Sequence, residues 1–256
     1  MINHPFHIVD SRPWPITGSL GRLFVVRRIA GLLNKYDARI LFGLGVVLIL
    51  FTIILWWRDI WRESTLQGKH TNKVEVGLRI GIIFFITREV CLFFSFFWAF
   101  FHSSLRPTRC WPPAGLTPIK PFDVPLLNTT LLLSRGATLT WAHMAIMNSQ
   151  DLEAHLGMIW TVILGSLFTC LQAFEYLYCS FSISDSVYGR IFFVATGFHG
   201  AHVIIGTIFI AIMWIRLYIG HFSRLHHFGF EASAWYWHFV DVVWLFLFIC
   251  IYWWGY

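Results

Sequence analysis

Long apolar stretches alternate with short polar segments along the chain. The clearest is an 18-residue run from Ile40 to Trp57 that carries no charged side chain and is followed at once by RDIWRESTLQGKHTNK. A membrane-spanning helix needs about 20 mostly apolar residues. The pattern predicts an all-α, polytopic transmembrane helix bundle that forms one domain over residues 1–256, with helices at roughly 16–34, 40–57, 80–103, 126–148, 155–177, 191–216 and 232–254.

The first of these stretches is ambiguous because it contains Arg22, Arg27 and Arg28. Each arginine costs about 2.5–3.5 kcal/mol at the centre of a spanning helix on insertion scales. Hydropathy alone therefore favours a helix that lies in the membrane interface, and the pattern leaves six or seven spans open.

Composition strengthens the membrane assignment. The chain is 57% hydrophobic and 12% charged, about half of the roughly 25% charged residues of a soluble domain. Its 19% aromatic content excludes disorder. The net charge of +6 comes without a block of basic residues, so we expect contacts with lipid head groups and none with nucleic acid.

Glu89 is the most informative polar residue, because an ionisable group inside a span is rare and usually functional. Helical spacing places Phe85 and Phe93 on the same side as Glu89, and burial among such rings favours the neutral acid. Contact with protons or lipid is the functional interpretation. The structural alternative is an ion pair with an arginine of another helix, such as Arg135.

The last predicted helix carries a polar stripe at steps of four, three and three residues. Such a stripe on a membrane helix faces protein instead of lipid, and we expect it to form structural hydrogen bonds between helices. Its members are Glu231, Trp235, His238 and Asp241.

Histidines raise a further alternative. His199 and His202 are one turn apart, so they could share a metal or a haem, with His143 and His238 as additional ligands. Histidines in spans also occur simply as hydrogen-bonded polar groups. From the residues alone, a proton-linked transporter, a haem-carrying cytochrome and a subunit that packs against partners or lipid all remain open.

Motifs along the whole chain resemble subunit III of haem-copper cytochrome c oxidase in its mitochondrially encoded form. They include HPFHIVDSRPWP, WPPAGLTPIKPFDVPLLNT, FSISDSVYGRIFFVATGFH and HHFGFEASAWYWHFVDVVWLFLFICIYWWGY. The resemblance implies seven spanning helices, arranged as two plus five around a lipid cleft. It also implies that this chain has no catalytic residue and binds no metal, since the haem and copper belong to subunits I and II.

The resemblance further implies a core, non-catalytic subunit of respiratory complex IV in the mitochondrial inner membrane. That complex reduces oxygen to water with electrons from cytochrome c and pumps protons. Its subunit III would contact subunits I and II and supernumerary subunits, stabilise subunit I, bind structural phospholipids and support proton uptake. The family's buried carboxylate corresponds to Glu89, and its lipid-contacting positions correspond to Trp56, Trp57, Glu63, His70 and Arg216.

Two departures from the family pattern affect these expectations. Arg88 stands where a small or neutral residue is common, so it could contact Glu89 or a lipid phosphate. Met144 stands where a second histidine is usual. If the first helix spans the membrane, we expect Arg22, Arg27 and Arg28 to face the lipid cleft or a partner protein.

Overall fold

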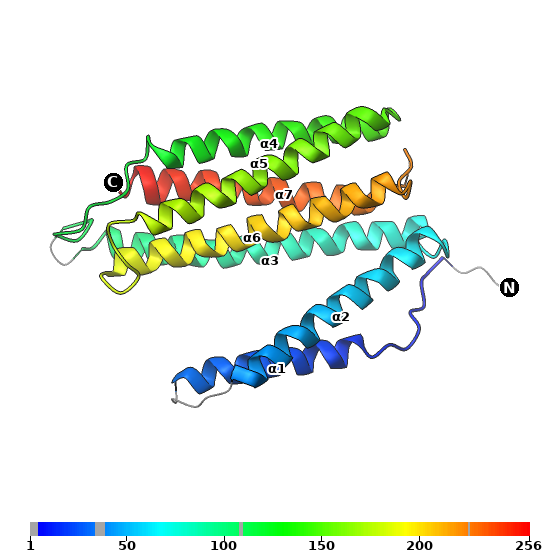
Figure 1. Cartoon of the computed structure of the whole chain (residues 1–256), viewed down its shortest axis with the longest axis horizontal. Coiled ribbons are helices and arrows are strands. Elements are labelled where there is room, and N and C mark those ends of the chain that lie inside the picture. Colours follow the sequence, from blue (N-terminus) through cyan, green and yellow to red (C-terminus); the bar gives the residue numbers. More distant parts are fainter. Residues whose placement is uncertain (1–4, 34–38, 108–109, 225) are drawn as a thin grey trace. The chain divides into compact units, whose positions relative to one another are not determined.

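The computed structural model describes residues 5–33, 39–107, 110–224 and 226–256. These residues form helices and no strand, which confirms the all-α prediction (Figure 1). The helices are α1 (Trp14–Leu33), α2 (Arg39–Thr65), α3 (Asn72–Ser104), α4 (Val124–Met147), α5 (Asp151–Leu177), α6 (Val187–Tyr218) and α7 (Phe228–Leu247), followed by the π-helical segment η1 (Phe248–Trp253).

Each predicted helix exists. α5, α6 and α7 begin four residues before their predicted starts, and α2 and α3 extend further still beyond the apolar runs. α2 continues past Trp57 to Thr65, and α3 begins at Asn72, eight residues before the predicted start. Hydropathy marks only the part of a helix that lipid can cover, whereas charged residues such as Glu and Arg are themselves good helix formers. Most of the segment predicted as a charged loop is therefore helical.

Local signals account for the starts of two helices. The side chain of Ser186 caps α6, because its Oγ accepts a hydrogen bond from the backbone N–H of Gly189 at 3.0 Å. Pro125 lies in the first turn of α4, where its missing N–H would have no helical partner in any case.

Five helices among the described residues are long and apolar enough to cross a membrane: α2, α3, α5, α6 and α7 with η1. α1, with its three arginines, is outside this set, in line with its ambiguous hydropathy. α4 is also outside it, although the pattern predicts a span there. Its polar residues, which include Asn128 and Arg135, lower its hydropathy.

The chain divides into two compact units, Met1–Leu78 and Arg79–Tyr256. In the first, α1 and α2 meet at glycines. A Cβ on Gly45 would lie 2.9 Å from the Gly21 carbonyl oxygen, so this approach requires glycine. Next to this contact, the hydroxyls of Thr17 and Thr52 form a hydrogen bond of 3.0 Å. The units group α1 and α2 apart from the later helices, as the two-plus-five arrangement expects.

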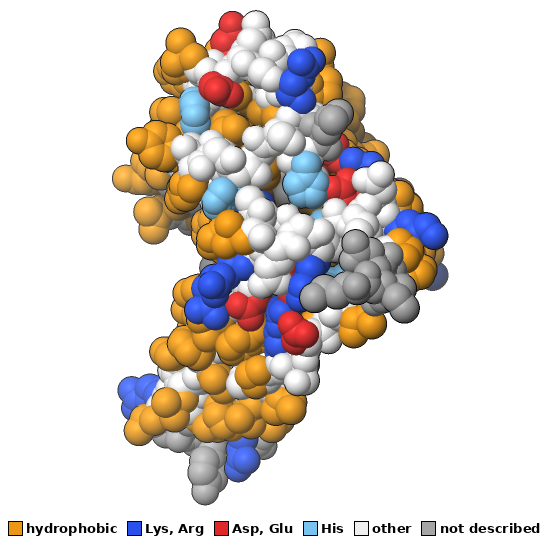
Figure 2. All heavy atoms as spheres, turned by 90° about the vertical axis from the view of Figure 1, so that its right-hand side faces the viewer, with side chains coloured by type: hydrophobic (Ala, Val, Ile, Leu, Met, Phe, Trp, Pro, Cys, Tyr) orange, Lys and Arg blue, Asp and Glu red, His pale blue; other side chains and the backbone are white. Residues whose placement is uncertain are grey.

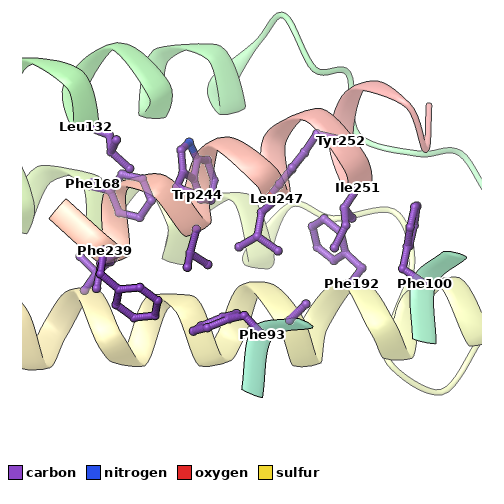
Figure 3. Packing of buried hydrophobic residues seen from close by; sticks show 14 of the residues in the cluster. Phe93, Phe100, Leu132, Phe168, Phe192, Phe239, Trp244, Leu247, Ile251 and Tyr252 are labelled. Atoms are coloured by element: carbon purple, nitrogen blue, oxygen red, sulfur yellow. The ribbon is translucent and has the colours of Figure 1, made fainter. Parts of the chain in front are cut away.

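The second unit packs around α7, which contacts both α4 and α6. Aromatic and aliphatic side chains of α3 to α7 and η1 fill its core (Figure 3). Trp244 of α7 packs edge-on against Phe168 of α5, with ring centroids 4.9 Å apart. Trp237 fits only because α6 has a glycine beside it, since a Cβ on Gly206 would lie 2.6 Å from its ring.

Candidate functional site

Glu89 lies at the contact between α3 and α6 and is buried, with 7% of its surface exposed. Arg88 Nε donates to Glu89 Oε1 at 3.2 Å, and His202 Nε2 lies 3.2 Å from Glu89 Oε2. His202 Nδ1 lies 2.7 Å from the Phe198 carbonyl oxygen. A carbonyl can only accept, so Nδ1 carries a hydrogen. The contact between His202 Nε2 and Glu89 therefore needs one further proton, held by either group.

The surroundings of Glu89 differ from the expected aromatic pocket. Phe93 packs against His202, with ring centroids 5.1 Å apart, but the carboxyl itself meets two basic groups. The Arg88 side chain is 70% exposed, and its guanidinium lies over the Phe85 ring at 4.9 Å. The contact between Arg88 and Glu89 thus exists, whereas the alternative pairing with Arg135 is wrong.

Arg135 instead pairs with Asp241 of the polar stripe. Its Nε and Nη2 donate to Asp241 Oδ1 at 3.2 and 3.0 Å. The guanidinium has no exposed surface and lies over the rings of Phe168 and Trp237, at 4.8 and 4.5 Å from their centroids. This contact joins the middle of α4 to α7.

The other members of the stripe are half-buried or exposed. Glu231 accepts hydrogen bonds from Arg79 of α3 and lies 3.5 Å from His227. His238 Nδ1 lies 3.9 Å from Asp241 Oδ2, but its side chain is 46% exposed. Trp235 is half-buried. The stripe thus reaches both α3 and α4.

His199 and His202 are directed at different partners. His199 is fully buried, and its Nε2 lies 3.2 Å from the Val240 carbonyl oxygen, while His202 contacts Glu89. Among the described residues, the group whose ligand atoms come close enough for a shared metal is a different one, namely His143, His227 and Glu231.

The expected lipid-contacting residues of the first unit have contrasting environments. Trp56 and Trp57 of α2 are exposed, by 39% and 46%. Glu63 is buried and forms an ion pair with Arg12, with His7 Nε2 at 3.6 Å. Glu63 is therefore enclosed by protein.

The segment before α1 packs against the C-terminal end of α2. Trp14 Nε1 donates to Asp59 Oδ2 at 2.9 Å, and the rings of His7 and His70 lie 6.4 Å apart. Sequence reasoning missed Arg12 and Asp59. The only available signal was their charge beside apolar stretches, and it does not identify a partner.

Arg216, the remaining expected lipid contact, lies near the end of α6 in the second unit. Its Nη1 lies 3.8 Å from the Met213 sulfur, and its guanidinium lies 4.8 Å from the centroid of the Phe222 ring. Its Nε is buried without a hydrogen-bond partner in the part of the chain that the structure describes. A Cβ on Gly229 would lie 2.7 Å from Nη1, so the glycine leaves room for the Arg216 guanidinium.

One buried polar contact was not anticipated. The hydroxyl of Tyr252 donates to Glu175 Oε1 at 2.6 Å, and both side chains are buried. Glu175 lies close to the end of an apolar run, where a carboxylate normally reaches water. Tyr252 lies in η1, which continues α7, and its hydroxyl contacts Glu175 and Gln172 of α5.

Comparison with known proteins gives a consistent result over the whole chain. The family model for cytochrome c oxidase subunit III matches residues 4–256. The cytochrome c oxidase subunit 3 of Pisaster ochraceus is 60% identical over 98% of both chains, and that of Heterololigo bleekeri is 56% identical over the full length of both. The subunit 3 of Anopheles gambiae is 55% identical over 99% of this chain and 98% of its own. The chain therefore belongs to the cytochrome c oxidase subunit III family and is a component of that oxidoreductase complex.

Proposed function

We propose that this chain is a core, non-catalytic subunit of the mitochondrial oxidase. It stabilises subunit I, holds structural phospholipid and supports proton uptake, while the haem and copper are bound by subunits I and II. Family membership favours this function over an independent transporter or a haem-carrying cytochrome. The proposal places the chain in the inner mitochondrial membrane.

The observation that carries the lipid role is the environment of Arg216. Its guanidinium is half-buried against a sulfur and an aromatic ring, and no carboxylate among the described residues pairs with it. A buried cation without an anion is costly. A phospholipid phosphate would supply the charge and the acceptors, because phosphate oxygens form strong hydrogen bonds with guanidinium groups.

Trp56 and Trp57 fit a lipid role in a different way. Both side chains are exposed on α2, and indole rings favour the head-group region of a bilayer. Glu63 and His70 would act indirectly, since both lie in the cluster formed with His7 and Arg12 and hold the end of α2 in place.

Support for proton uptake would come from Glu89 and His202. Their contact requires a proton that either group can carry, as the Phe198 carbonyl fixes the hydrogen on Nδ1. A proton shared in this way can pass between the two groups with little movement of either side chain. It contains no redox-active group, which fits a supporting role.

Exposed apolar surface supports the role as a partner of subunit I. On α3, the side chains of Phe84, Phe94 and Trp98 are between 66% and 71% exposed. Lipid or a neighbouring subunit must cover a surface of this kind in the membrane. If the chain does not co-purify with the haem-bearing subunit from native membranes, this part of the proposal is wrong.

The lipid role is tested by Arg216→Gln in the purified complex, with Arg190→Gln as the matched control. Arg190 is exposed at the opposite end of the same helix. Phospholipid per complex is counted by mass spectrometry after delipidation in detergent. We expect Arg216→Gln to retain about one phospholipid fewer, since the phosphate loses its charge-assisted hydrogen bonds, and the control to match the unmodified protein. Equal retention in both variants would refute the lipid role of Arg216.

A further inference from the structure

Three potential metal ligands come together at the end of the second unit where α4 ends and α7 begins. His143 lies in the last turns of α4, His227 directly precedes α7, and Glu231 lies in the first turn of α7. One ligand atom from each lies within 4.8 Å of the others. Figure 2 views the chain from this end, where histidine, acidic and basic side chains interrupt the apolar surface.

The hydrogen bonding of His227 leaves a lone pair directed into this group. Its Nδ1 lies 3.1 Å from the Ser223 carbonyl oxygen, so Nδ1 carries the hydrogen and Nε2 is an acceptor. That Nε2 lies 3.5 Å from Glu231 Oε1, which is also an acceptor. The side chain is buried, with 7% exposed. Two acceptors that face each other at this distance require a cation or a proton between them.

His143 supplies the third ligand. Its Nε2 is buried and has no hydrogen-bond partner among the described residues. The rings of His143 and His227 meet edge-on with centroids 5.6 Å apart. A buried polar atom without a partner carries a desolvation cost, and a shared cation would remove that cost for both imidazoles at once.

The contacts around these ligands resemble the outer shell of a metal site. A ligating histidine usually donates its other N–H to a carbonyl or carboxylate, as His227 does to Ser223. Arg79 Nε donates to Glu231 Oε2 at 3.2 Å, and its Nη2 lies 3.1 Å from the same oxygen in the ion pair. Nη2 also donates to Oε1, in a longer hydrogen bond of 3.4 Å. Because Arg79 already balances the Glu231 charge, a bound cation would be exchangeable.

We propose that His143, His227 and Glu231 bind a divalent transition-metal cation of the zinc class, with a fourth position open to water. Two imidazoles and one carboxylate are a zinc ligand set, and metal–ligand distances near 2.0–2.1 Å put the ligand atoms about 3.4 Å apart. The separation of 3.5 Å between His227 and Glu231 already matches this value. A small rotation of His143 would complete the group and tie the end of α4 to the start of α7.

Equilibrium dialysis of the purified complex against radioactive Zn²⁺ tests this proposal. The variants are His227→Ala, His227→Cys, which keeps a zinc ligand, and the control His102→Ala. His102 is exposed near the C-terminal end of α3, whereas Arg79, which contacts Glu231, lies near the start of that helix. We expect His227→Ala to lose one exchangeable Zn²⁺ per complex, and the cysteine variant and the control to keep it. His143→Gln provides the same comparison if His227→Ala does not assemble.

Two results would overturn the proposal. The first is unchanged zinc stoichiometry and affinity in the assembled His227→Ala complex, which would mean that a proton fills the gap. The second is equal loss of zinc from the alanine and cysteine variants, which would indicate lost packing instead of lost ligation. The test is independent of the lipid and proton roles, because its readout is bound zinc in an assembled complex.

Discussion

The buried pair of Arg135 and Asp241 gives the sharpest stability prediction. Asp241→Asn leaves the guanidinium without its anion, while Phe168 and Trp237 prevent it from reaching water. Breaking a buried ion pair by removal of one partner costs about 3–5 kcal/mol. We therefore expect the ratio of folded to unfolded protein to fall at least about a hundredfold, since roughly 1.4 kcal/mol corresponds to a factor of ten.

The assay is SDS-induced unfolding of the full chain in mixed detergent micelles, followed by the fluorescence of its 14 tryptophans. Asp123→Asn is the matched control, because Asp123 is exposed before α4 and its side chain makes no capping hydrogen bond. Surface substitutions of this kind change stability by about 0.5 kcal/mol or less. The double variant Arg135→Met with Asp241→Leu should recover much of the loss, because no unpaired charge remains. The reasoning is refuted if Asp241→Asn behaves like the control, or if the double variant is as unstable as the single one.

Three further predictions follow from individual contacts. Gly45→Ala should destabilise the first unit by roughly 1–3 kcal/mol through overpacking, whereas Gly43→Ala, which meets nothing within 4 Å, should not; thermal unfolding compares them. Glu89→Gln should leave the initial rate of oxygen consumption nearly unchanged but shorten the lifetime of activity during turnover; an immediate loss of rate in the assembled complex would contradict this. The backbone N–H and hydroxyl of Ser182 hold the pKa of Asp185 below its usual value of 3.8, so the contact stabilises the loop above that pH and is lost as pH falls through the lower, folded-state pKa. Hydrogen exchange of the loop should show this loss, and Asp185→Asn should abolish its pH dependence.

The pattern of apolar residues predicted the helices because hydropathy is a sum over neighbouring residues. The free energy of transferring about 20 apolar side chains into lipid outweighs other local preferences. The same transfer free energy is unfavourable for a carboxyl group, which is why Glu89 stood out within its apolar run. The exact ends of α2 and α3 escaped this argument, since charged helix-forming residues continue a helix beyond the apolar run. The partner of Glu63 also escaped it, because Arg12 lies 51 positions earlier.

Sequence alone determined that this chain is a helical membrane protein of the subunit III type and which polar residues are out of place in it. Tertiary structure decided what those residues contact: His202 lies 113 positions from Glu89, and Asp241 lies 106 from Arg135. It also brought His143 to His227 and Glu231. Such pairs depend on the rotation and crossing of packed helices, which side-chain interdigitation sets. No periodicity within a single helix contains that information.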